Sequence, residues 1–273
     1  MDPHVLIAKD ALGCNWDTTN FFLFSGNIDS IFIYYSHIFP ALACLFLVFL
    51  VWPQDRKNPI NISFLVLGIA FALWSLLDLI VWATGNIDLM MFLWSLLPIL
   101  EIIIFAAPLY LIYFFVNKQH PPFKYLFIVF LLVLPIVLLT HTKLNLINFD
   151  YTNCERNATE GILMNYLYSL ELLATMSVFY FVRNKMFNST KEILTIATGI
   201  TLFFLSFSLG NIIGGNTELS WEVGQYGLFG MPIFLGFLVY SMFKYKTFNI
   251  RIFRNSIVAI TCFAIAFSLL FFY

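Results

Sequence analysis

Long apolar stretches separated by short polar segments dominate this sequence. A helix needs about 20 mainly apolar residues to span a bilayer. Eight stretches suit this role, of which the fourth is short: 30–52, 60–83, 89–116, 125–140, 161–182, 193–213, 225–243 and 255–273. The alternating segments typical of membrane β-barrels are absent from the sequence. The pattern therefore predicts an all-α fold, a polytopic membrane bundle of seven transmembrane helices plus an eighth at the C-terminus.

The same pattern divides the chain into four parts. We expect an N-terminal tail over 1–29, a seven-helix bundle over 30–243, a basic linker over 244–254 and the eighth helix over 255–273. The last apolar stretch runs to Tyr273 without a polar flank. We therefore expect a truncated helix and a chain that is part of a longer protein.

Composition agrees with a chain whose main partner is the lipid bilayer. Hydrophobic residues make up 61% and charged residues 11%, whereas soluble domains have about 25% charged residues. A net charge of -1 without a basic stripe argues against nucleic-acid binding. Four cysteines without a C-x-x-C motif give no zinc site, and stretch 225–243 lacks the lysine that retinal would need. We predict no metal and no cofactor.

The Lys and Arg residues indicate how the bundle is oriented. Cytoplasmic loops carry an excess of these residues. With the N-terminus outside, eleven of the fourteen fall on the inner side, three on the outer side and none within a span. Ten acidic residues fall on the outer side in this arrangement. The sequence therefore predicts an N-terminus that lies outside the cell.

Three acidic residues lie within the predicted spans: Asp78, Glu101 and Glu171. A carboxylate near the bilayer centre costs about 2.5–3.5 kcal/mol on insertion scales, so such residues are functional candidates. Because the spans contain no Lys or Arg, these acids are either protonated or reached by water, a cation or His37.

Other polar residues join these acids in one candidate ligand site. Trp74 shares a helix face with Asp78, and Asn211 and Gln225 lie in the outer halves of the sixth and seventh spans. Together they predict a polar cavity that opens outward and binds an unknown small ligand. The alternative, in which these groups only hydrogen-bond neighbouring helices, stays open.

Cys14 and Cys154 both fall on the predicted outer side. They can form a disulfide that fixes the tail to the long outer loop, or they can remain two free thiols.

The segment after the seventh span is the most distinctive in the chain. Residues 238–251 read LVYSMFKYKTFNIR, preceded by SLGNII at 208–213 and by Pro232 within the span. This resembles the end of the N-terminal seven-transmembrane sensor region of bacterial histidine kinases, although Thr-Phe-Asn replaces the more usual Leu-Phe-Asp. The resemblance implies a multi-pass protein of the bacterial plasma (inner) membrane. It also implies a homodimer that serves a response regulator through a kinase core beyond these residues. Its signal-exit segment would carry Lys244, Lys246, Arg251 and Arg254.

The sequence thus favours the signal-sensing input region of a two-component histidine kinase. No phosphoacceptor histidine box or ATP-binding glycine box is present, so we assign no catalytic residues to this chain. The first alternative is a small proton- or cation-coupled transporter that uses Glu101 and Glu171. A seven-helix receptor that acts through a separate protein is another.

Overall fold

The computed structural model describes residues 25–28, 30–149, 157–183, 191–216 and 221–245, and its helices follow the predicted stretches closely. The helices are α2 (Ile31–Val51), α3 (Pro59–Ala83), α4 (Ile87–Asn117), α5 (Phe123–Leu139), α6 (Ile162–Arg183), α7 (Lys191–Asn216), α8 (Trp221–Gly224) and α9 (Gly230–Tyr245). Short 3₁₀ helices η1 (Trp52–Gln54) and η2 (Gln225–Phe229) follow α2 and α8. The predicted eighth span at 255–273 lies outside the described residues.

Six helical segments of the described part are long and apolar enough to cross a membrane. They are α2 with η1, α3, α4, α6, α7 and the continuous run from α8 through η2 to α9. The stretch predicted as the fourth span is the apolar helix α5, which has only 17 residues. The chain is thus a multi-pass helical membrane protein.

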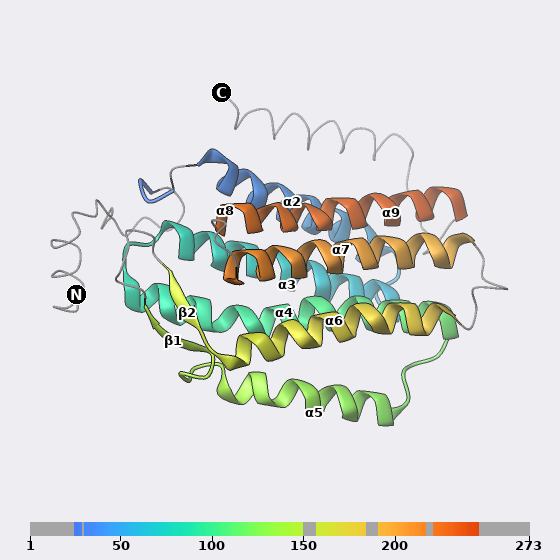
Figure 1. Cartoon of the computed structure of the whole chain (residues 1–273). Helices are drawn as coiled ribbons and strands as arrows, with labels where there is room; N and C mark the ends of the chain where they lie inside the picture. The colour runs from blue at the N-terminus through green and yellow to red at the C-terminus, as the bar shows by residue number, and fades with distance from the viewer. Residues whose placement is uncertain (1–24, 29, 150–156, 184–190, 217–220, 246–273) are drawn as a thin grey trace, which may run out of the picture.

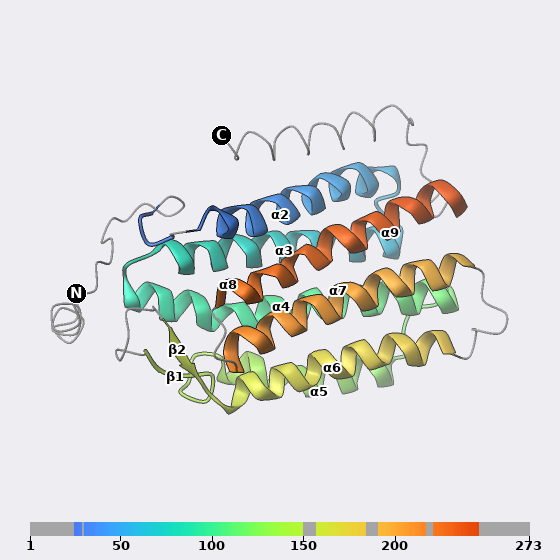
Figure 2. The ribbon, with the colours of Figure 1, turned by 45° about the horizontal axis from the view of Figure 1, so that its top comes forward.

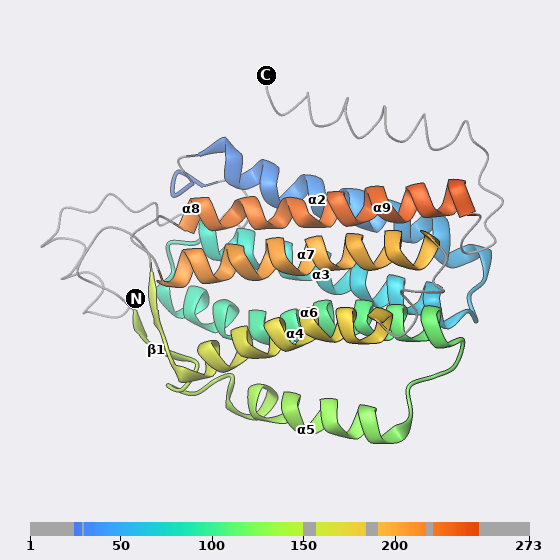
Figure 3. The same ribbon diagram turned by 45° about the vertical axis from the view of Figure 1, so that its right-hand side comes forward.

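The six long segments form a closed ring around a common core (Figures 1 and 3). Each packs against the next in the order α2, α3, α4, α6, α7, α9, and α9 returns to α2. Figure 2 shows α9 between α2 and α7. Helix α5 stays outside this ring and contacts α4 and α6. The final span therefore touches both the first helix and α7.

Side-chain caps and aromatic packing explain why these segments fold as they do. Ser30, Asn58 and Asn86 cap the first turns of α2, α3 and α4, each accepting a hydrogen bond from a backbone N–H. Six phenylalanines are the largest fully buried side chains: Phe64, Phe71, Phe203, Phe204, Phe207 and Phe234. They come from α3, α7 and α9, so the core fixes the positions of these helices.

A small hairpin covers one end of the bundle, where the sequence predicts the long outer loop. Strands β1 (Leu146–Phe149) and β2 (Ala158–Glu160) pair antiparallel. Asn145 holds this loop in place through two hydrogen bonds. Its side-chain amide donates to the backbone carbonyl of Thr140 at 2.7 Å, and its backbone carbonyl accepts from the Gly161 N–H at 2.6 Å. Thr140 in turn donates to the carbonyl of Ser95 in α4. We call this the hairpin end of the bundle.

The final span changes helix type where it enters the bundle. Four residues of α8 are followed by five 3₁₀ residues in η2 before α9 begins. The approach of α8 to α7 depends on glycine, because a Cβ atom on Gly210 would lie 2.5 Å from the carbonyl oxygen of Gly224. A 3₁₀ segment within a longer helix often marks a hinge.

Candidate functional site

His37 of α2 and Asp78 of α3 form a buried pair near the hairpin end. Nε2 of His37 lies 2.7 Å from Oδ2 of Asp78, and Nδ1 lies 2.6 Å from the carbonyl oxygen of Ile33. That carbonyl can only accept, so Nδ1 carries a hydrogen and donates it. One further proton lies between Nε2 and the carboxyl group. The pair is then neutral overall, whichever partner holds this proton.

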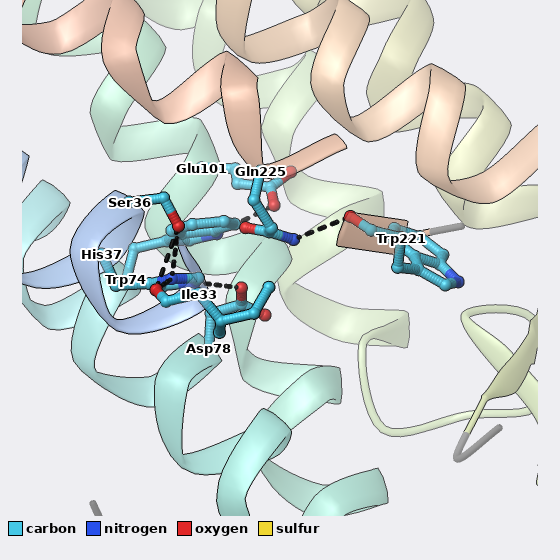
Figure 4. Close-up of polar contacts among 8 residues, drawn as sticks. All are labelled: Ile33, Ser36, His37, Trp74, Asp78, Glu101, Trp221 and Gln225. Carbon is cyan, nitrogen blue, oxygen red and sulfur yellow. Dashed lines mark hydrogen bonds and ion pairs between the residues drawn. The ribbon is translucent and has the colours of Figure 1, made fainter. Parts of the chain in front are cut away.

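Trp74 and Glu101 form a second contact (Figure 4). Trp74 lies on α3 one helical turn before Asp78, on the side away from the hairpin end. Nε1 of Trp74 donates to Oε1 of Glu101 in α4 at 2.9 Å. Trp74 and Asp78 are four residues apart, about 6 Å along the helix axis. Helix α3 therefore presents two polar side chains, one joined to α2 and the other to α4.

The carboxyl group of Glu171, on α6, lies beside that of Glu101 within hydrogen-bonding range. Ser208 and Asn211 of α7 also lie near Glu171, although neither makes a well-formed hydrogen bond through Oγ or Nδ2 within the described residues. Within the described residues, however, no well-formed hydrogen bond satisfies Oε2 of Glu101 or either carboxylate oxygen of Glu171. Side-chain exposure is only 3% for Glu101 and 1% for Glu171. Such buried, unsatisfied acceptors are unusual and call for a ligand or a proton.

A small cavity lies next to this group of carboxyls, between α7 and the start of the last span. Its volume is about 10 Å³, which is close to what one water needs. Its lining includes Trp74, Phe207, Gly210, Asn211, Trp221, Gly224, Gln225, Gly227 and Leu228. The cavity thus connects the residue that binds Glu101 with η2 of the final span.

Glu160 lies outside the spans, at the end of β2, and is bound to the first turns of α6. The Tyr168 hydroxyl lies 3.0 Å from one oxygen of Glu160 and 2.9 Å from the other. Burial raises the pKa of Glu160 to about 7, and the hydrogen bond from Tyr168 opposes this shift. This carboxyl group, at the hairpin end, thus titrates near neutral pH.

The structure brings most of the predicted site residues together, but as two groups. His37 meets Asp78, whereas Trp74, Glu101, Glu171 and Asn211 gather one turn deeper, with Gln225 on the shared cavity. Gln225 donates a long 3.4 Å hydrogen bond to the carbonyl of Trp221 (Figure 4). We call Trp74, Glu101, Glu171, Ser208, Asn211 and Gln225 the polar cluster.

Some predicted residues cannot be placed in either group. Cys14, Cys154, Lys246, Arg251 and Arg254 lie outside the described residues. Lys244 lies exposed in the last turn of α9, with its ammonium group 5.9 Å from the centre of the Tyr240 ring. It is therefore at the opposite end of the last span from the polar cluster.

Sequence reasoning did not select Ser208 or the Glu160–Tyr168 contact. Ser208 precedes Asn211 by three residues, so helical spacing places both on one face of α7. The contact of Glu160 depends on the hairpin, whose fold the sequence pattern does not specify.

Comparisons with protein-family models, with curated proteins and with solved structures gave no match for this chain.

Proposed function

We propose that this chain is the membrane-embedded signal-input region of a sensor protein, of the type that precedes the kinase core in bacterial histidine kinases. The polar cluster would receive the signal, and the last span would carry it toward the opposite end of the bundle. The membrane would be the bacterial plasma membrane. The protein would act as a homodimer and pass phosphate to a response regulator through the kinase core.

The distribution of charge supports an orientation with the hairpin end outside the cell. Of the eight Lys and Arg residues in the described part, only Lys143 lies at the hairpin end. The other seven lie at the opposite end, between or beside the helix termini. An excess of Lys and Arg is typical of the cytoplasmic side. The polar cluster would thus lie in the outer half of the bundle, and Lys244 would lie at the inner surface.

The observation that carries this proposal is the contact of the polar cluster with the 3₁₀ segment of the last span. Gln225, the first residue of η2, shares the cavity with Trp74 and Asn211. If the five residues of η2 became α-helical, the segment would shorten by about 2.5 Å and α9 would turn by about 100° about its axis. A change of hydrogen bonding in the cluster can therefore be converted into motion of α9.

The transcript beyond codon 273 tests the kinase assignment. We expect the reading frame to continue into a coiled coil, a phosphoacceptor histidine and an ATP-binding core. A stop codon soon after residue 273, or another membrane domain, would contradict it.

Proton- or cation-coupled transport is the second candidate, because the buried carboxyls of Glu101 and Glu171 have the character of intramembrane ion sites. Proteoliposomes that contain a pH-sensitive dye separate the two functions. A sensor region gives no sustained proton or sodium flux under an imposed gradient. Flux that disappears in Glu101→Gln but persists in Asp88→Asn, at an exposed acid of α4, would favour transport.

A further inference from the structure

The side chains of Glu101 and Glu171 face each other as two groups that can only accept hydrogen bonds when ionised. Of their four carboxylate oxygens, only Oε1 of Glu101 accepts a well-formed hydrogen bond within the described residues, from Trp74. Two acceptors at this separation have no attractive contact. One added proton turns one of them into a donor, so that each carboxyl group gains a partner.

Among the described residues, the surroundings provide no opposite charge for the pair. Two further acidic groups act electrostatically on Glu101, Asp78 of α3 and Glu160 at the hairpin. Asp78 is occupied by His37, and Glu160 accepts from the Tyr168 hydroxyl.

The remaining helices offer neutral or distant groups. Helix α7 contributes the Ser208 hydroxyl and the Asn211 amide. The Lys and Arg residues of the described part lie at helix ends or in loops. The described residues also contain no cluster of three or more His, Cys, Asp or Glu side chains that could hold a metal ion. These surroundings favour protons over a metal ion as the occupant of the pair.

We propose that the Glu101–Glu171 pair is a proton-binding site, and that the proton is the ligand of the polar cluster. One proton is shared between the two carboxyl groups at neutral pH, and a second binds on acidification. This inference rests on the proposed function for its biological meaning, since it names the signal that the input region receives.

Binding of the second proton affects the last span through Ser208 and Asn211 of α7. While the pair carries one negative charge, it attracts the Ser208 hydroxyl and the Asn211 amide of α7, which have no well-formed hydrogen bond of their own within the described residues. The second proton neutralises the pair and weakens this attraction. Asn211 also lines the cavity next to Gln225 of η2, so a movement of Asn211 away from Glu171 changes the contacts of the 3₁₀ segment.

Infrared difference spectroscopy of the purified chain in lipid nanodiscs tests the site directly. We expect a carbonyl band of protonated carboxylic acid at neutral pH that increases on acidification. Glu101→Gln and Glu171→Gln should each remove the shared-proton signal. Asp88→Asn, the exposed control, should leave it intact. Asn211→Leu removes a donor to the ionised form, so it should move the midpoint of the second step to higher pH.

Three results would overturn the inference. One is a neutral-pH spectrum without a protonated buried carboxyl group. Another is a band that survives both glutamine variants. The third is a band that sodium chloride removes at constant pH while potassium chloride does not, which would identify a sodium site. Circular dichroism of each variant confirms that it is folded. Because the spectra need no signalling output, this inference and the proposed function can fail separately.

Discussion

Nε2 of His37 lies 2.7 Å from Oδ2 of Asp78, so two helices of the bundle share a proton inside the apolar core. Both residues are buried, with exposures of 1% and 8%. This pairing neutralises Asp78, which lies nearest the hairpin end among the three acids within the predicted spans. Of the three acids within the predicted spans, Glu101 and Glu171 then remain without a countercharge among the described residues.

Breaking this pair should destabilise the bundle strongly. Removal of one partner from a buried ion pair costs about 3–5 kcal/mol, because the other is left unpaired. We expect His37→Leu to lower the thermal unfolding temperature in detergent far more than His120→Gln, an exposed histidine. The double variant His37→Leu with Asp78→Leu should recover much of the loss. A single variant as stable as the wild type would contradict the pairing.

Trp74→Phe removes the N–H that Glu101 accepts while keeping an aromatic ring. Hydrogen bonds to charged groups contribute about 1.5–3 kcal/mol, so unfolding measurements should show a loss of this order. Leu73→Phe changes a neighbouring side chain that is 46% exposed, and should have little effect. Equal effects of the two variants would show that the hydrogen bond is not important.

Two glycines give a matched test of the contact between α7 and α8. Gly210→Ala would place a Cβ atom 2.5 Å from the Gly224 carbonyl oxygen, whereas a Cβ on Gly236 meets nothing within 4 Å. We expect Gly210→Ala to cost about 1–3 kcal/mol through overpacking. Gly236→Ala should be neutral or stabilising by up to about 1 kcal/mol, since alanine favours helix. The reverse order of stability would contradict the close approach.

The hairpin should lose stability as pH rises toward neutral. Burial raises the pKa of Glu160 from 4.5 to about 7, so the folded state holds a proton that the unfolded state releases between these values. The stabilisation is complete below about pH 4.5 and is lost as pH rises through 7. Hydrogen exchange of residues 144–149 and 157–161, after correction for the intrinsic pH dependence, should show falling protection over this range. Glu160→Gln should remove this trend, and an unchanged trend would exclude Glu160 as its source.

The proposed orientation predicts which end of the bundle is accessible from outside intact cells. A membrane-impermeant maleimide should label Lys143→Cys in whole cells and Gln119→Cys only after permeabilisation, in a background without native cysteines. The opposite labelling would place the hairpin end in the cytoplasm.

The helices could be predicted from the sequence because each is a long apolar stretch that ends at polar or capping residues. The three buried acids could also be selected, since charge is rare in such stretches. Their partners could not. Whether His37 meets Asp78 or Glu101 depends on how α2 is rotated against α3, and one sequence does not contain that angle. The 3₁₀ segment at 225–229 could not be predicted either, because it is part of one continuous apolar stretch over 225–243.

The coupling of the polar cluster to the last span can be measured as a distance between two spin labels at the end opposite the hairpin. The labels would replace Gln119, after α4, and Phe243, which is 47% exposed on α9. Gln225→Leu and Glu171→Gln alter the cluster, whereas Val223→Leu changes an exposed residue of α8 as the control. We predict that both cluster variants shift the distance distribution and that Val223→Leu does not. Identical distributions in all four proteins, wild type included, would contradict the transmission of a signal from the cluster through α9.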